Sequence, residues 1–135
     1  MLIRKKGFSF SKKEIKDLVK AWLVLSLAFA IVFSKMNTTS FINIFLISAI
    51  TVGTAFIFHE LGHKFTAQHY GCFAEFRSFD NMLFLALILS FFGFIFAAPG
   101  AVMISGPIGK RRNGKISLAG PLTNMILAVL FLIIH

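Results

Sequence analysis

The chain contains few acidic residues, few prolines and almost no cysteine. Of its 135 residues five are acidic, three are proline and one is cysteine. The single cysteine, Cys72, excludes an internal disulfide and offers no thiolate cluster for a metal. The acids are few enough to name, and any site that needs carboxylates must draw on them: Glu14, Asp17, Glu60, Glu75 and Asp80.

Hydrophobic residues, by contrast, are abundant. They make up 57% of the chain, which includes 18 phenylalanines, and this composition is typical of a membrane protein with one domain. The formal net charge is +9. The basic residues cluster at the ends of apolar runs and show no interleaving with aromatic residues. We therefore expect them to set the topology and to contact the lipid bilayer, and we expect no nucleic acid partner.

The apolar runs predict an all-α polytopic membrane protein with three to four transmembrane helices. We expect a basic interfacial segment over residues 1–18, in which Ser11 and Glu14 have capping-box spacing. A membrane-embedded domain over 19–135 follows, with spans at about 19–34, 41–70, 82–98 and 116–134. Residues 99–109 are rich in glycine and proline and predict a re-entrant or extended segment.

The topology depends on residues 82–98. The basic segment over residues 1–18 predicts that the protein lies in the cell membrane with its N-terminus on the cytoplasmic side. The second span then brings its own C-terminal end back to the cytoplasmic face. If residues 82–98 cross the membrane fully, the basic run 110–115 lies outside, against the positive-inside rule. If they form a re-entrant or hairpin element, that run stays inside. We favour the second arrangement.

The most informative motif is His59-Glu60-Leu61-Gly62-His63, near the end of the second apolar run. In a helix, positions i and i+4 share a face, so His59 and His63 are able to bind one metal ion. Glu60 lies beside them as a candidate general base. Two helix-face histidines also occur as ordinary packed residues. Ionisable groups in an apolar span are expensive and usually functional, which favours a catalytic zinc site.

His69 is a further candidate metal ligand. Its spacing from His59 and His63 matches zincins in which a third histidine follows a glycine that turns the chain. Thr66 occupies the glycine position here, and a β-branched residue resists the positive-φ turn. We therefore favour His69 as an interfacial polar residue. The alternative is a membrane-anchored zincin that uses His69 as its third ligand.

Three stretches together resemble the site-2 protease family of intramembrane zinc metalloproteases, of archaeal or bacterial type. They are HELGHKFTAQHYG at 59–71, PGAVMISG at 99–106 and SLAGPLTN at 117–124. The resemblance implies that His59 and His63 hold zinc, that Glu60 acts as general base, and that the substrate is a transmembrane protein. It also implies substrate-binding roles for Gly100, Ala101, Val102 and Asn124. Asn124 has an equal alternative as a residue that bonds the backbone at the start of a span.

One element of the family pattern is missing. The family's third ligand is an Asp in a later span, and no acid in this chain matches it. We therefore expect the C-terminal part of the family's domain to be absent from this sequence. A catalytically incomplete protein of protease descent, which binds transmembrane helices without cutting them, is the alternative function. The sequence leaves the oligomeric state open.

Overall fold

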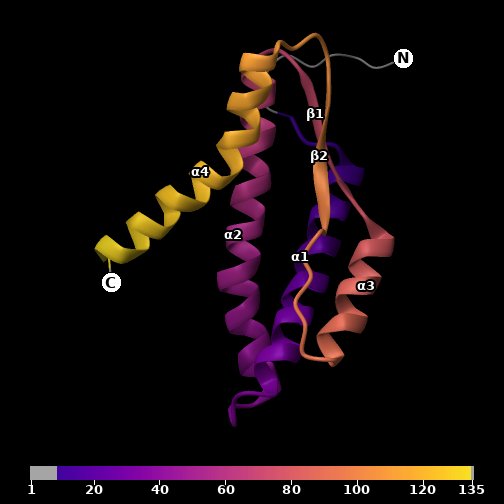
Figure 1. Ribbon diagram of the computed structural model, residues 1–135, viewed down its shortest axis with the longest axis vertical. Coiled ribbons are helices and arrows are strands. Elements are labelled where there is room, and N and C mark those ends of the chain that lie inside the picture. Colours follow the sequence, from indigo (N-terminus) through magenta and orange to yellow (C-terminus); the bar gives the residue numbers. More distant parts are fainter. Residues whose placement is uncertain (1–8, 135) are drawn as a thin grey trace.

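The computed structural model describes residues 9–134 and is mostly helical (Figure 1). Three of its helices are long and apolar enough to cross a membrane, namely α1 (Lys12–Ser34), α2 (Phe41–His69) and α4 (Lys110–Ile134). A shorter apolar helix, α3 (Asp80–Phe91), and two strands, β1 (Phe73–Ser78) and β2 (Gly100–Ser105), complete the fold. The expected polytopic helical fold is confirmed, with a small sheet added to it.

Helix α1 begins earlier than the predicted first span. Ser11 caps it, and its hydroxyl accepts a hydrogen bond of 3.0 Å from the backbone N–H of Glu14. The side chain of Glu14 does not return to the cap and instead points into the protein, where it is fully buried. The predicted boundary at residues 18/19 therefore falls inside one continuous helix. The rest of the basic segment, at residues 1–8, lies outside the described residues, as does His135.

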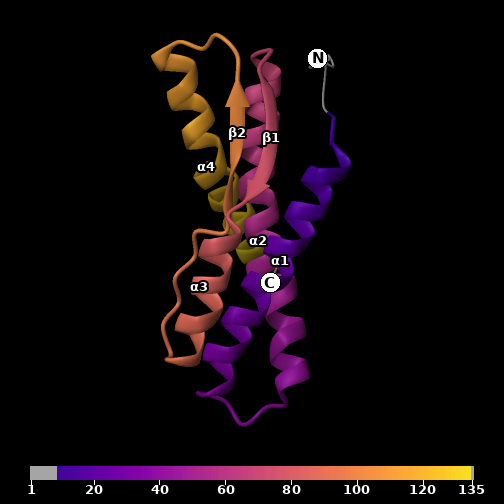
Figure 2. The same ribbon diagram turned by 90° about the vertical axis from the view of Figure 1, so that its right-hand side faces the viewer.

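Helices α1 and α2 pack side by side over most of their length (Figures 1 and 2). Trp22 of α1 lies in this contact, and its indole N–H donates to the backbone carbonyl of Ala49 on α2 at 2.9 Å. An ideal Cβ at Gly53 would lie 1.8 Å from the same indole nitrogen. The small residues Ala49 and Gly53, four positions apart, thus admit a close neighbour, and that neighbour is a tryptophan ring.

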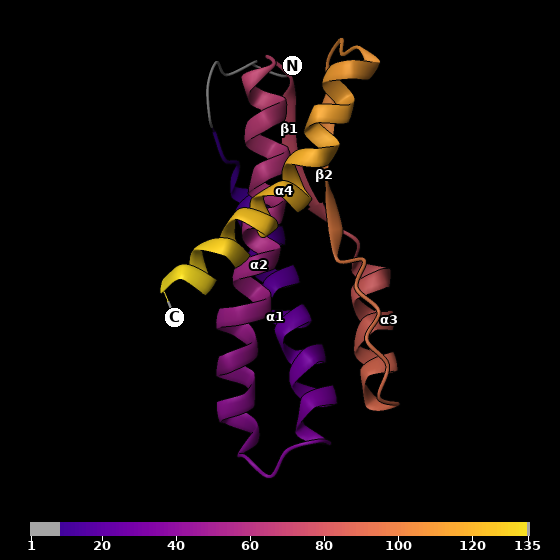
Figure 3. The ribbon, with the colours of Figure 1, turned by 60° about the vertical axis from the view of Figure 1, so that its left-hand side comes forward.

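Residues 79–99 form a hairpin rather than a complete crossing. After α3 the chain turns at Gly93, which has a positive φ of 86°. It then runs back beside α3 (Figures 1 and 3). The two ends of the hairpin are joined by a hydrogen bond of 2.9 Å from the N–H of Phe79 to the carbonyl of Pro99. A twelve-residue helix is about 18 Å long, which is too short to span a bilayer.

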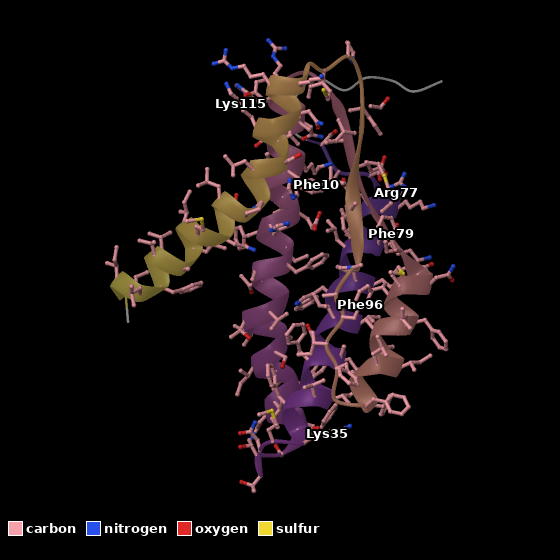
Figure 4. All side chains as sticks on the ribbon, in the orientation of Figure 1. Phe10, Lys35, Arg77, Phe79, Phe96 and Lys115 are labelled. Carbon is pink, nitrogen blue, oxygen red and sulfur yellow. The ribbon has the colours of Figure 1, made fainter. Side chains whose placement is uncertain are left out.

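Because of this hairpin, the start of α4 lies at the same end of the molecule as the end of α2. The guanidinium of Arg112 sits 5.2 Å from the centroid of the Tyr70 ring. In Figure 4 Lys115 lies at this end and Lys35 at the opposite end. The basic run 110–115 therefore shares an end with the metal motif, as the hairpin arrangement requires.

Strands β1 and β2 form an antiparallel pair in which Phe76 lies opposite Val102 and Ser78 opposite Gly100. Carboxylates of α1 cover the other edge of β1. The N–H of Phe76 donates to Glu14 at 2.7 Å, and the N–H of Ser78 donates to Asp17 at 3.1 Å. The sequence analysis did not predict β1, because its alternation is short and interrupted by Glu75 and Arg77.

Candidate metal centre

Helix α2 brings His59 and His63 together, one turn apart. Their Nε2 atoms are 3.1 Å apart, and the two rings meet edge to face with centroids 4.8 Å apart. Both side chains are half-buried. Two imidazoles with converging nitrogens form half of a tetrahedral metal site, so the spacing in the sequence becomes a real pair in space.

The orientation of His63 is set by α4. Its Nδ1 lies 2.7 Å from the backbone carbonyl of Ile116. A carbonyl only accepts hydrogen bonds, so Nδ1 carries the proton and Nε2 presents its lone pair. An acceptor on the distal nitrogen is the usual support for a histidine that ligates a metal.

The orientation of His59 is set by Asn124, also on α4. The Nδ2 atom of Asn124 is 3.3 Å from His59 Nδ1, while Oδ1 of the same amide is buried and has no hydrogen-bond partner. A half-turn of the amide exchanges these two atoms, and Oδ1 then accepts a proton from Nδ1. His59 in that tautomer also presents the lone pair of Nε2. The partnerless oxygen thus has a use once His59 binds a metal.

Close contact between α2 and α4 makes both supports reachable. The helices meet at Gly62 and Gly120, where in each case an added Cβ would overlap the opposite helix. Ile116, Gly120 and Asn124 follow one another at four-residue intervals, so they lie on one face of α4. That face covers the metal pair.

Zinc fits this donor set. Two ligands at about 2.1 Å in a tetrahedral arrangement are about 3.4 Å apart, close to the observed 3.1 Å. Both imidazoles have a group positioned to fix the required tautomer. Neutral imidazole is a preferred ligand of zinc.

Glu60 lies between the two histidines in the sequence of α2 and is largely withdrawn from solvent, with 8% of its surface exposed. A carboxylate in such a place needs a positively charged or protonated partner.

The remaining candidates lie elsewhere. Helix α2 continues without a break to His69, whose exposed ring packs against Tyr70 rather than turning back to the pair. The structure therefore does not bring His69 to His59 and His63, because a helix places residues 63 and 69 on different faces. Gly100, Ala101 and Val102 form the first half of β2, which packs near α2.

A third protein ligand is not found between residues 9 and 134, where no group of three His, Cys, Asp or Glu side chains is placed to hold a metal. Four of the five acids have other partners. Glu14 binds Lys64, Asp17 binds the backbone of Ser78, Glu75 binds Arg77, and Asp80 binds Lys20. Glu60 is the fifth. Catalytic zinc sites usually have three protein ligands and an open position.

A known protein is similar to this chain in sequence. A protein of Methanocaldococcus jannaschii described as a "putative zinc metalloprotease" is 47% identical over 129 residues. The similarity extends over nearly the whole length of the present chain. The match covers 94% of the chain and 64% of the relative, so the chain spans somewhat less than two thirds of the relative's length. No family model matches the chain, and no solved structure matches it significantly.

Two supporting groups were missed by the sequence analysis. The carbonyl of Ile116 leaves no signal in a sequence, because every residue has one. Gly120 did leave a signal, since a glycine before Pro121 four residues from Asn124 marks a face of α4 that is able to approach another helix closely.

Proposed function

We propose that this chain forms the zinc-binding part of an intramembrane metallopeptidase of the site-2 protease type. The observation that carries the proposal is the pair of Nε2 atoms of His59 and His63, 3.1 Å apart, with supports from α4 on both distal nitrogens. Glu60 lies between the two histidines in the sequence. The similarity to a protein described as a zinc metalloprotease supports the same assignment.

In the proposed reaction Glu60 moves protons. Its carboxylate takes a proton from the attacking water and delivers it to the amine that leaves the cleaved peptide bond. Zinc, when bound by His59 and His63, supplies Lewis-acid polarisation and a water of lowered pKa. Ile116 and Asn124 hold the two imidazoles in the tautomers that this chemistry needs.

The free edge of β2 is suited to an extended substrate. Because the N–H of Phe76 points to Glu14, the pair Phe76–Val102 lacks mutual hydrogen bonds. The backbone groups of Val102 therefore also point away from β1. A locally unwound transmembrane segment would add there as a third strand, with Gly100 and Ala101 beside it. The other edge of the sheet is closed by Glu14 and Asp17, so only β2 is open to addition.

The third ligand belongs to the proposal as well. The resemblance implies an Asp from a later span, and the relative is longer than the matched region. The proposal places the catalytic end of the molecule at the cytoplasmic face, because the lysines and arginines at the starts of α1 and α4 favour that side of the membrane.

The test is the zinc content of the detergent-purified chain. We expect about one zinc per chain, lost in His63→Ala and retained in Glu60→Gln. In the full-length protein that supplies the third ligand, cleavage of a model transmembrane substrate should then disappear in Glu60→Gln although zinc remains. Zinc content unchanged by His63→Ala would refute the proposed site.

A catalytically incomplete helix-binding protein is the second candidate, favoured by the lack of a third ligand in residues 9–134. It predicts that a transmembrane peptide binds wild type and Glu60→Gln equally and is not cut by either. Cleavage that depends on Glu60 would exclude it.

A further inference from the structure

A basic pocket lies on the opposite side of the molecule from α4. It has a volume of about 550 Å³ and forms where the first turns of α1 meet the end of β1 and the start of α3. Five cationic side chains and two carboxylates line it: Lys12, Lys13, Lys16, Lys20 and Arg77, with Asp17 and Asp80. Figure 4 shows Arg77 on this side, away from α4.

Two of these cations have ion-pair partners, and three have none within residues 9–134. Lys20 binds Asp80 at 2.7 Å, and Arg77 binds Glu75 at 2.6 Å. The other three, Lys12, Lys13 and Lys16, are exposed and form no ion pair within residues 9–134. The pocket therefore carries unneutralised positive charge and favours an anionic group with several acceptor oxygens.

An apolar crevice lies further along α1, between α1 and the start of α2. It has a volume of about 470 Å³, and its walls are side chains of α1 and α2: Leu23, Val24, Leu27, Phe41, Ile42 and Phe45. Lys16, Lys20, Leu23 and Leu27 are spaced by four, three and four residues, so they form one stripe on the helix. From Lys16 to Leu27 the helix rises about 16 Å, which is comparable to an acyl chain.

The pocket also lies at the depth where a lipid headgroup belongs. Lys64 binds Glu14 at the first turn of α1, and Trp22 binds Ala49 further along, so the two antiparallel helices are aligned in depth. Below this level α1 exposes Val19 and Leu23. Cations above and apolar side chains below are the pattern of a membrane interface.

We propose that α1 carries a binding site for one anionic phospholipid, with the phosphate in the basic pocket and an acyl chain in the apolar crevice. A free phosphate ion would use the pocket alone and leave the crevice without a role. This site is separate from the metal pair, and its existence does not depend on the proposed peptidase activity.

The experiment is lipid titration of the detergent-purified full chain, monitored by native mass spectrometry. The probes are dioleoylphosphatidylglycerol and dioleoylphosphatidylcholine. The test variant is Lys12→Gln/Lys13→Gln/Lys16→Gln. The matched control is Lys110→Gln/Arg111→Gln/Lys115→Gln, which removes the same charge from α4. Leu27→Trp, which fills the crevice and leaves the charges intact, provides a second variant.

We expect wild type to retain phosphatidylglycerol and lose phosphatidylcholine. Affinity for phosphatidylglycerol should fall by about tenfold to a hundredfold in the α1 triple variant, and by much less in the α4 control. Leu27→Trp, in a chain that keeps all of its lysines, should also weaken the binding of phosphatidylglycerol. Equal losses in the two triple variants would show unspecific attraction and overturn the site. Unchanged binding in Leu27→Trp would overturn the role of the crevice and leave a phosphate-only pocket.

Discussion

Gly120 on α4 lies directly against the imidazole of His63 on α2: an ideal Cβ at Gly120 would be 2.3 Å from Nε2. This nitrogen is the one that faces the proposed metal. Gly120 therefore sets both the distance between the helices and the space in front of the ligand.

Gly120→Ala should abolish or strongly weaken zinc binding, because the added methyl group displaces the His63 ring. Gly114→Ala is the matched control on the same helix. A Cβ there meets nothing within 4 Å, and alanine is favoured over glycine in a helix by about 1 kcal/mol. Zinc content and competition with a chelator measure the difference. Equal zinc affinity in both variants would contradict the close packing of α4 on His63.

Asn124→Ala should weaken zinc binding by about 10- to 100-fold, the usual cost of losing a group that orients a ligating histidine. Asn124→Asp should retain most of the affinity, since a carboxylate still accepts from His59 Nδ1. Asn113→Ala, an exposed position at the start of α4, serves as the control. If Asn124→Asp behaves like Asn124→Ala, the residue does not act through an acceptor oxygen.

His69→Ala should leave zinc content unchanged, because α2 remains helical up to that residue and the ring is exposed. Metal analysis beside His63→Ala decides the point. Loss of zinc in His69→Ala would restore the alternative of a membrane-anchored zincin.

Lys64→Met should destabilise the fold by about 3–5 kcal/mol, because it leaves the Glu14 carboxylate buried without its cation. Glu14→Gln in the same chain should recover part of this loss. The control is Lys20→Met, which breaks an exposed pair with Asp80 and should have little effect. The free energy of unfolding, measured with denaturant in detergent, gives the comparison. Equal effects of Lys64→Met and Lys20→Met would show that the buried ion pair between Lys64 and Glu14 stabilises the fold no more than the exposed pair does.

Acidification should loosen β1 from the start of α1. Burial alone would raise the pKa of Glu75, but hydrogen bonds from Arg77 and Ser11 outweigh it and hold that pKa below its usual range. A lowered pKa stabilises the fold above the unfolded-state value, and this contribution is lost as the pH falls through the folded-state value. The hydrogen-exchange protection factors of β1, which are corrected for the intrinsic pH dependence of exchange, should fall on acidification in wild type. In Glu75→Gln that fall should be smaller.

The sequence was sufficient for the features that depend on periodicity and composition. Apolar length predicted three to four membrane helices, of which three are long enough to cross a membrane, and the four-residue spacing predicted the pairing of His59 with His63. The small sheet was only half expected: the glycine- and proline-rich segment indicated extended chain at Gly100, but its partner β1 was not predicted. The paired residues are 22 to 32 positions apart in the chain, and local propensity does not report such a pairing.

The structural roles of the acidic residues could not be predicted from the sequence either. Glu14 and Asp17 lie among lysines and look like parts of a solvated helix face, yet they bind the backbone of β1. Such burial is visible only when the partner strand is in place. Lys64 is almost fully buried, because Glu14 and the carbonyl of Ala74 satisfy its ammonium group.

Two neighbouring residues of α2 connect to opposite ends of the chain. Lys64 is held by Glu14, 50 positions earlier, and His63 is held by the carbonyl of Ile116, 53 positions later. During synthesis the first contact becomes available as soon as α2 has emerged, whereas the second must wait for α4. A ribosome-bound chain that stops before Ile116 would therefore have α1 and α2 joined by the Lys64–Glu14 ion pair, while His63 would lack its hydrogen-bond acceptor on α4. Acquisition of the metal would then follow the insertion of α4 beside α2.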